Sequence, residues 1–508
     1  MPDIRYVCLS DLHFGAENSI LSRLVDGAVV VDATVPSPVL ERLVAAMRQL
    51  IERNEDQSRR PTLILNGDII ELALASDNVA LMVFERFLDL AFPPGGEPLF
   101  DSTVYYLPGN HDHHLWESAR ERQYGTFVAA LDPGRPLPLP GHATALYPGE
   151  DRPPVQSELL NEIAHRNPAR PPVDFRVSYP NLGLRSDDGS TVVVFHHGHF
   201  SEAIYQLMTT LKDLVFPGRV RATRLWDIEA ENFAWIDFFW STLGRSGEVG
   251  EDVGLIYDML QSTEAIDTAA NNLSTGLALR LPHVGLTGRL RWLLRPVIRQ
   301  AVRRVATHIA SSERRTPHVA LSESSAAGLM TYLSGPLLGQ LRSESAGDSG
   351  ALPEHLKFIF GHTHKPFTGT RNVRGLSHPV RVFNTGGWVV DTLRAQPLSG
   401  ANMVLLDENL EVASVRVYNQ SDDPGSYRVG FDDGVPEEHG AFRERLSPWV
   451  DPALPVWRDL SAAIADLVAE RQRALSWIIK NAGNPRQAAR VAAPESEQSG
   501  ASEHASGS

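Results

Sequence analysis

The chain has 508 residues, with 47 Lys and Arg against 62 Asp and Glu, which gives a formal net charge of −15 at pH 7. Hydrophobic residues make up 42% and charged residues 21%, a balance typical of a folded protein and too apolar for a disordered one. A single cysteine excludes an internal disulfide framework and a cysteine-based zinc finger, and the acidic charge disfavours non-specific nucleic-acid binding.

The sequence shows neither a membrane-spanning segment nor a secretory signal. No uncharged apolar run reaches the roughly 18 residues that a spanning helix needs. The first residues, M-P-D-I-R, lack the basic and apolar regions of a secretory signal. We therefore expect a cytoplasmic protein.

In chain order, the first predicted strand covers residues 4–10 and is followed by Asp11-Leu12-His13. Because alternate residues of a strand face the same side, Asp11 and His13 can reach one ion together. The second predicted strand, 61–66, ends in G-D-I-I-E, which contains Asp68.

The third predicted strand, 103–108, runs into G-N-H-D, which contains Asn110 and His111. The fourth, 191–195, precedes H-H-G-H, and the fifth, 356–360, precedes G-H-T-H. These last two motifs supply His196, His197, His199, His362 and His364. Alternation places His197 and His199 on one side of the fourth strand and His196 on the other, so we expect His196 to be packed or to support a ligand from behind.

Five strand ends that all carry Asp, Asn or His indicate one site at the carboxyl edge of a sheet, where open α/β folds place their chemistry. Imidazole and carboxylate groups together are ligands for transition-metal ions. The pattern therefore predicts a metal site.

The same motifs, in this order, resemble those of the calcineurin-like metallophosphoesterase superfamily. The resemblance covers about residues 4–390 and includes N-T-G-G-W at 384–388, which is similar to a late turn of the family. It implies an α/β fold in which helices flank a β-sandwich, with two metal ions at the loops above it.

The resemblance also implies a role for each motif residue. The implied ligands are Asp11, His13 and His364 for one ion, Asp68 as the bridge, and Asn110, His197 and His362 for the other. His111 would assist phosphate binding or protonate the leaving group, and His199 is expected to contact substrate phosphate. Either Glu71 or Asp112 could accept its ring proton, as carboxylates beside metal sites do.

The expected activity is that of a dinuclear phosphohydrolase in which a metal-bridging hydroxide cleaves a phosphoester or pyrophosphate bond. A phosphodiesterase or diphosphatase is expected first. The alternatives are a phosphomonoesterase, including a protein phosphatase, a nuclease of the same fold, and a non-catalytic binding protein. Manganese is the expected metal, with iron, zinc or magnesium as alternatives. Protein phosphatases of the family carry G-D-x-V-D-R-G and G-N-H-E, from which this sequence departs.

The spacing of the motifs predicts how the chain is divided. Residues 1–199 and 356–420 form the two parts of the core, and residues 200–355 form a large helical insertion between them. Residues 421–483 are expected to be a linker and a C-terminal helix, and 484–508 a disordered tail.

Within the insertion, Arg291, Arg295 and Arg299 recur every four residues and define one face of a predicted basic amphipathic helix. Such a helix suits a lipid-linked or other phosphorylated substrate, or peripheral contact of residues 286–315 with an anionic membrane. The alternative is a lid helix whose arginines pair with the acidic surface of the protein. Nucleic acid is not an expected partner.

Overall fold

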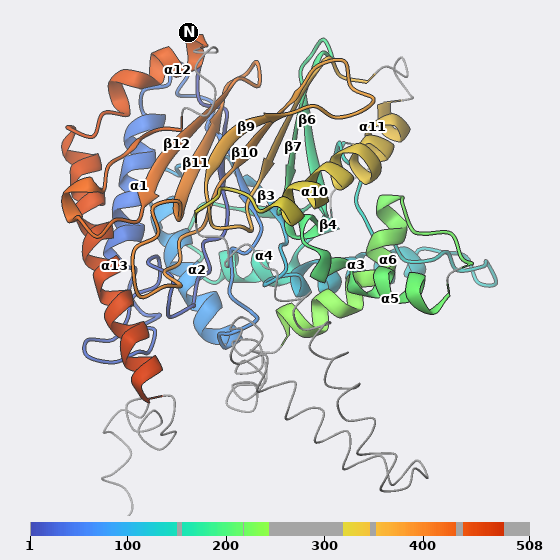
Figure 1. Ribbon diagram of the computed structural model, residues 1–508, viewed down its shortest axis with the longest axis horizontal. Helices are drawn as coiled ribbons and strands as arrows, with labels where there is room; N and C mark the ends of the chain where they lie inside the picture. Colours follow the sequence, from blue (N-terminus) through green and yellow to red (C-terminus); the bar gives the residue numbers. More distant parts are fainter. Residues whose placement is uncertain are drawn as a thin grey trace, which may run out of the picture.

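The computed structural model describes residues 2–149, 155–216, 218–242, 318–345, 352–432 and 440–481. In this part of the chain two β-sheets pack against each other and helices cover their outer faces (Figure 1). Apolar side chains fill the space between the sheets, with Ile64 and Leu107 from one and Val193, Phe195 and Ile359 from the other. The predicted α/β class, a metallophosphoesterase-type β-sandwich flanked by helices, is confirmed.

The first sheet has eight strands in the order β13-β12-β11-β1-β2-β3-β5-β4. They are β1 (Tyr6–Leu9), β2 (Thr62–Asn66), β3 (Thr103–Leu107), β4 (Val155–Gln156), β5 (Asp174–Val177), β11 (Gly400–Leu406), β12 (Val412–Asn419) and β13 (Gly430–Phe431). Strands β1, β2, β3 and β5 are parallel. Parallel strands are covered on both faces, so β2 is a continuous apolar run with Leu63, Ile64 and Leu65 fully buried.

The second sheet has five strands in the order β6-β7-β8-β10-β9. They are β6 (Asn181–Arg185), β7 (Thr191–His196), β8 (His355–Phe360), β9 (Phe367–Arg371) and β10 (Val380–Asn384). Strand β7 pairs in parallel with β8, although more than 150 residues separate them along the chain. The predicted insertion is therefore the connection between two neighbouring strands.

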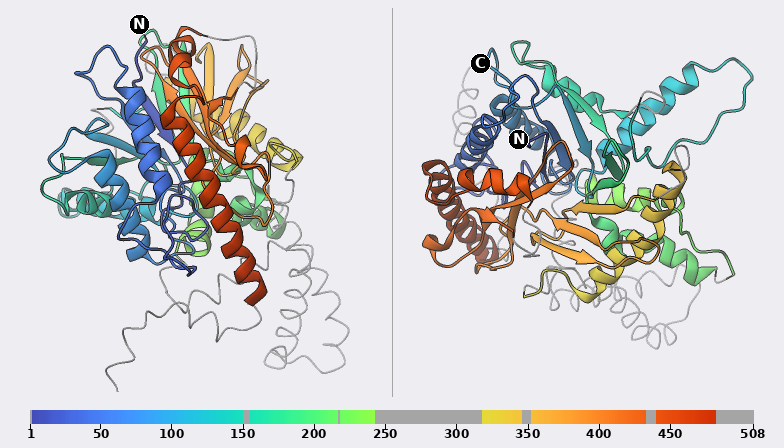
Figure 2. Two further views of the ribbon diagram at one scale, coloured as in Figure 1. Left: turned by 90° about the vertical axis from the view of Figure 1, so that its left-hand side faces the viewer. Right: turned by 90° about the horizontal axis from the view of Figure 1, so that it is seen from above.

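Helices on the outer face of the first sheet bury its apolar side chains. They are α1 (Pro38–Ile51), α2 (Asp77–Ala91), α4 (Glu158–His165), α12 (Ala441–Leu446) and α13 (Pro455–Asn481), with the short η8 (Pro424–Ser426) and η9 (Ser447–Trp449) between β12 and α13. The Ser37 hydroxyl accepts a hydrogen bond from the Leu40 N–H and so caps the start of α1. Helices α1 and α13 lie side by side (Figure 2).

The described part of residues 200–355 is helical and packs on the outer face of the second sheet. Its elements are η2 (Ala203–Gln206), α5 (Leu207–Val215), α6 (Leu225–Ile236), η3 (Asp237–Ser241), α10 (Glu323–Tyr332), η7 (Leu333–Leu337) and α11 (Leu338–Ser345), preceded by η1 (His199–Ser201). One more helix, α3 (His114–Ala129), starts directly after G-N-H-D and contacts η3. The predicted domain boundaries remain predictions, and residues 286–315 and 484–508 lie outside the described part.

Among the described residues, every helix is too short or too polar to cross a membrane. The strands β1, β2 and β3 of one sheet and β7 and β8 of the other end at the same edge of the sandwich. This edge is where the polar motifs of the sequence come together.

Candidate metal centre

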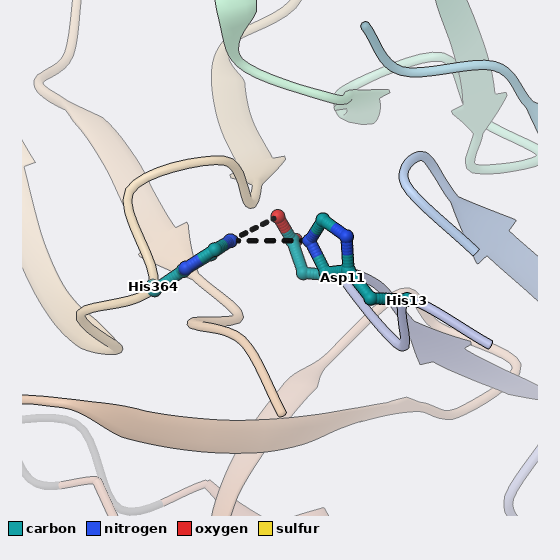
Figure 3. Close-up of side chains that lie close together, drawn as sticks. All are labelled: Asp11, His13 and His364. Atoms are coloured by element: carbon teal, nitrogen blue, oxygen red, sulfur yellow. Dashed lines mark hydrogen bonds and ion pairs between the residues drawn. The ribbon is translucent and has the colours of Figure 1, made fainter. Parts of the chain in front are cut away.

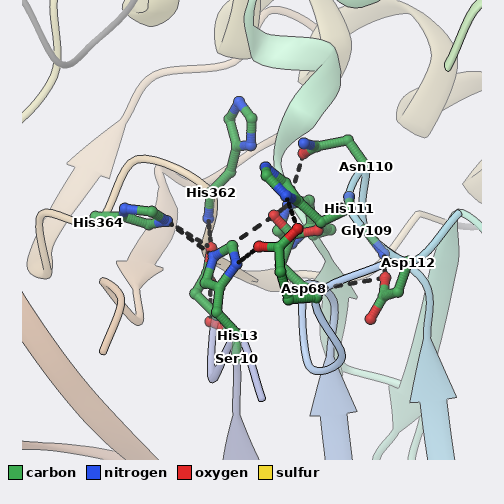
Figure 4. Close-up of polar contacts among 12 residues, drawn as sticks. Ser10, His13, Asp68, Gly109, Asn110, His111, Asp112, His362 and His364 are labelled. Carbon is green, nitrogen blue, oxygen red and sulfur yellow. Dashed lines mark hydrogen bonds and ion pairs between the residues drawn. The ribbon is translucent and has the colours of Figure 1, made fainter. Parts of the chain in front are cut away.

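The eight residues predicted as metal ligands or proton donor lie together in the loops that follow β1, β2, β3, β7 and β8. They are Asp11, His13, Asp68, Asn110, His111, His197, His362 and His364, and none has a side chain more than about a tenth exposed. Figure 4 labels His13, Asp68, Asn110, His111, His362 and His364 among them. In the described part of the chain, three groups of side chains could each hold a metal ion, with ligand atoms within 4.8 Å of one another. The groups are Asp11 with His13 and His364, His13 with Glu71 and His111, and Asp68 with His197 and His362.

The first group joins the loops after β1 and β8 (Figure 3). The Nε2 atoms of His13 and His364 lie 3.3 Å apart, and His364 Nε2 lies 3.5 Å from Asp11 Oδ1. The Nδ1 atoms of the two rings face carboxylates instead, Glu71 at 2.8 Å and Asp391 at 3.4 Å. Two imidazole nitrogens and a carboxylate oxygen therefore converge on one place, as the ligands of a cation do.

The group of Asp68, His197 and His362 lies beside the group of Asp11, His13 and His364. Asp68 Oδ2 lies 3.2 Å from His197 Nε2 and 3.9 Å from His13 Nε2, so this carboxylate lies between these two groups. The amide of Asn110 places Oδ1 3.1 Å from His197 Nε2. The other Asp68 oxygen accepts a hydrogen bond of 2.8 Å from the backbone N–H of His111.

The backbone is strained at most of these positions. Among the described non-glycine residues, φ is positive at Leu410 and at five site residues, Asp11, His13, Asp68, His362 and His364. This conformation is uncommon outside glycine and is tolerated where the surroundings enforce it. Strand β1 ends at Leu9 and β8 at Phe360, so the D-x-H and H-T-H pairs lie in loops beyond the strands. The turns of these loops bring both residues of each pair to the site. The prediction that strand alternation does so was wrong.

The glycines of two motifs are required by close packing. A Cβ at Gly109 would lie 2.3 Å from Asp68 Oδ1, and one at Gly361 would lie 2.1 Å from Asp11 Oδ2. Neither contact is sterically acceptable. The metal-binding carboxylates predicted from sequence therefore lie directly against backbone that carries no side chain.

Glu71, and not Asp112, accepts the ring proton of His111. Its Oε1 lies 2.8 Å from His111 Nδ1, and its Oε2 lies 2.8 Å from His13 Nδ1. Asp112 instead accepts hydrogen bonds from the backbone N–H groups of Ile69 and Gly109 and from the Tyr106 hydroxyl. Asp112 thus holds the G-D and G-N-H-D loops together, while Glu71 orients two imidazoles.

Electrostatic interactions in the site favour bound positive charge. Burial raises the pKa of Asp68, but His197, His111 and His13 lower it further, so the carboxyl stays well below its usual range. Burial lowers the pKa of His197, and the opposing attraction of Asp68 raises it to about 9. A divalent cation would replace the proton that the raised pKa keeps on His197, because neutral imidazole is the form that binds metal. The donor set of carboxylate, amide and imidazole fits a divalent metal ion.

The predicted substrate contacts have different outcomes. His199 is fully buried in η1, where its ring lies 4.3 Å from that of Phe200 and its Nε2 3.4 Å from the Tyr179 hydroxyl. Its contact with phosphate stays a prediction. His196 packs against Tyr332, with ring centroids 4.5 Å apart, as expected. Arg291, Arg295 and Arg299 lie outside the described residues.

Several residues around the site were given no role in the sequence analysis. Asp391 faces His364 and accepts a hydrogen bond of 2.7 Å from the Asn18 amide. The Ser10 hydroxyl donates to Asp11 Oδ2, and Thr385 of the N-T-G-G-W turn contacts the same hydroxyl. Of these residues, only Thr385 lies in a motif that sequence comparison could single out.

The sandwich fold and the buried Asp and His groups together define a metal-dependent phosphoesterase. Residues 4–216 match the family model described as calcineurin-like phosphoesterase, so this part of the chain is similar to the calcineurin-like metallophosphoesterase superfamily. This confirms the resemblance seen in the motifs. Comparison with curated proteins gave no match.

Proposed function

We propose that the protein is a dinuclear phosphodiesterase or diphosphatase. The position of Asp68 carries this proposal, since one carboxylate oxygen lies near His197 of one ligand group and His13 of the other. A carboxylate placed between two ligand groups can bind two ions at once and set their spacing.

The residues of the chain divide between the two ions. Asp11, His13 and His364 would hold the first, Asn110, His197 and His362 the second, and Asp68 both. When bound, two divalent ions would clamp a phosphate group and lower the pKa of a water molecule. Manganese is our first proposal, and iron, zinc and magnesium are compatible with the same ligands.

His111 is the proposed proton donor to the leaving group. Its backbone N–H is fixed by Asp68 and its Nδ1 by Glu71, so the ring has one orientation. Burial raises the pKa of Glu71, but His111 and His13 lower it further, so this carboxyl remains ionised. An ionised Glu71 stabilises the imidazolium form of His111, in which Nε2 can give its proton to the leaving oxygen.

The surroundings of His362 favour a small substrate over a folded phosphoprotein. The buried Tyr205 of η2 lies against the His362 ring, with centroids 5.1 Å apart, so the insertion covers this side of the site. We propose a phosphorylated small molecule or a lipid-linked diphosphate as substrate. The lipid-linked class is supported by the basic sequence of residues 286–315.

Metal-stripped protein reloaded with Mn²⁺ tests the proposal, with p-nitrophenyl phosphate and bis-p-nitrophenyl phosphate as substrates. We expect faster diester cleavage, and no turnover by Asp68→Asn. The matched control is Asp466→Asn, at an exposed position of α13. Faster monoester cleavage would favour a phosphomonoesterase, and preferred cleavage of a DNA oligonucleotide would favour a nuclease. Two bound ions without any cleavage would favour a binding protein.

A further inference from the structure

The helical insertion meets the candidate metal centre at Glu202, between η1 and η2. Its Oε1 lies 3.7 Å from Nε2 of His362, and the two side chains are 11% and 7% exposed. The Tyr205 ring lies across that of His362 at an interplanar angle of 79°, and Trp240 of η3 packs on Tyr205 at 5.1 Å. The insertion therefore surrounds the outer side of this imidazole.

An imidazole that binds a metal ion through one nitrogen donates the N–H of the other, and the acceptor fixes the tautomer and the ring orientation. The other three predicted histidine ligands each have such an acceptor near Nδ1. For His13, His364 and His197 the acceptors are Glu71, Asp391 and the backbone carbonyl of Asn66.

His362 differs from these three ligands. Its Nε2 is buried and has no hydrogen-bond partner among the described residues. Glu202 is the carboxylate that faces this atom, and a small movement of either side chain would close the gap to a hydrogen bond. Glu202 belongs to none of the three ligand groups found in the described part of the chain.

We propose that Glu202 is a positioning residue, which accepts the Nε2–H of His362 and so directs Nδ1 toward the second metal ion. The inference rests on the proposed function, because it requires His362 to be a ligand. It makes the insertion part of the metal centre. The backbone supports the same orientation, since the His362 N–H donates to Asp11 Oδ1 at 2.9 Å.

Titration of metal-free protein with Mn²⁺, followed by calorimetry and by electron paramagnetic resonance, tests the inference. We expect wild type to bind two ions. Glu202→Ala should bind the first ion with unchanged affinity and the second about 10- to 100-fold more weakly, as loss of such acceptors does. Glu202→Gln should lie between them, because the amide oxygen still accepts a hydrogen bond. The control is Glu323→Ala, an exposed glutamate of α10.

The outcomes separate the two proposals. If wild type binds no ion, or only one, the proposed dinuclear function is wrong. If wild type binds two ions and both Glu202 variants match it, the role of Glu202 is wrong and the function stands. If Glu202 had only a structural role, its variants would lower the thermal unfolding midpoint of the metal-free protein. Wild type, Glu202→Gln and Glu202→Ala would then bind the second ion with the same affinity. Should Glu202→Ala fail to fold, Glu202→Gln alone decides the question.

Discussion

At the scale of single residues, the two oxygens of Glu71 accept from different imidazoles. One fixes His111, the proposed proton donor, and the other fixes His13, a proposed ligand of the first ion. The proton donor and a metal ligand therefore share one buried carboxylate. An aspartate at this position would be too short to reach both the His111 and the His13 rings, because its side chain has one methylene fewer.

Glu71→Gln should lower kcat about 100-fold, the contribution expected of a positioned acid, because the neutral amide no longer stabilises the imidazolium of His111. Steady-state kinetics with the diester substrate measures this effect, and metal analysis should show that two ions still bind. Glu52→Gln, at an exposed position after α1, is the control and should match wild type. Equal kcat values for Glu71→Gln and wild type would remove Glu71 from the mechanism.

At the scale of elements, the site depends on turns that begin where strands end. Three β-strands of the first sheet and two of the second end at one edge, and their loops return sharply enough to need positive φ at five residues. The motif glycines Gly109 and Gly361 allow the loops to pack this closely, because a Cβ at either position would collide with the side chain of Asp68 or Asp11. The loops are therefore defined by packing as much as by hydrogen bonds.

Gly109→Ala tests the packing. The added Cβ would lie 2.3 Å from Asp68 Oδ1 and 2.8 Å from His197 Cδ2, so the loop must shift. We expect the free energy of unfolding to fall by about 1–3 kcal/mol, as overpacking does, and Mn²⁺ affinity to fall with it. Gly339→Ala in α11 is the control, since its Cβ would meet nothing within 4 Å, and it should be neutral or slightly stabilising. An unchanged Gly109→Ala variant would show that the loop adapts without cost.

Features that depend on neighbouring residues in the chain could be predicted from the sequence, and those that depend on contacts between distant segments could not. The strand ends, the eight motif residues and the sandwich followed from local patterns and the family resemblance. The choice between Glu71 and Asp112 did not, because it depends on how two loops fold against each other. Asp391 and Glu202 were missed for the same reason. Asp391 approaches His364 across 27 residues of chain, and Glu202 approaches His362 from the other side of the insertion.

At the scale of the whole molecule, the C-terminal helix is joined to the loop that follows the D-x-H motif. The guanidinium of Arg471 in α13 is buried and donates to the carbonyls of Ser19 and Ser22. The Ser19 hydroxyl in turn donates to the carbonyl of Leu12, between Asp11 and His13. A residue more than 450 positions away therefore supports the backbone of the candidate metal centre.

Arg471→Ala should remove about 2–3 kcal/mol from the free energy of unfolding, because it leaves two buried carbonyls without the charged donor that satisfies them. Urea unfolding measures the loss. Arg473→Ala is the control, since Arg473 is exposed on the same helix and its removal should have little effect. Arg471→Lys should recover only part of the loss, because an ammonium group cannot reproduce the forked geometry that reaches both carbonyls. If Arg471→Ala and Arg473→Ala unfold at the same urea concentration, α13 covers the sheet without supporting the site.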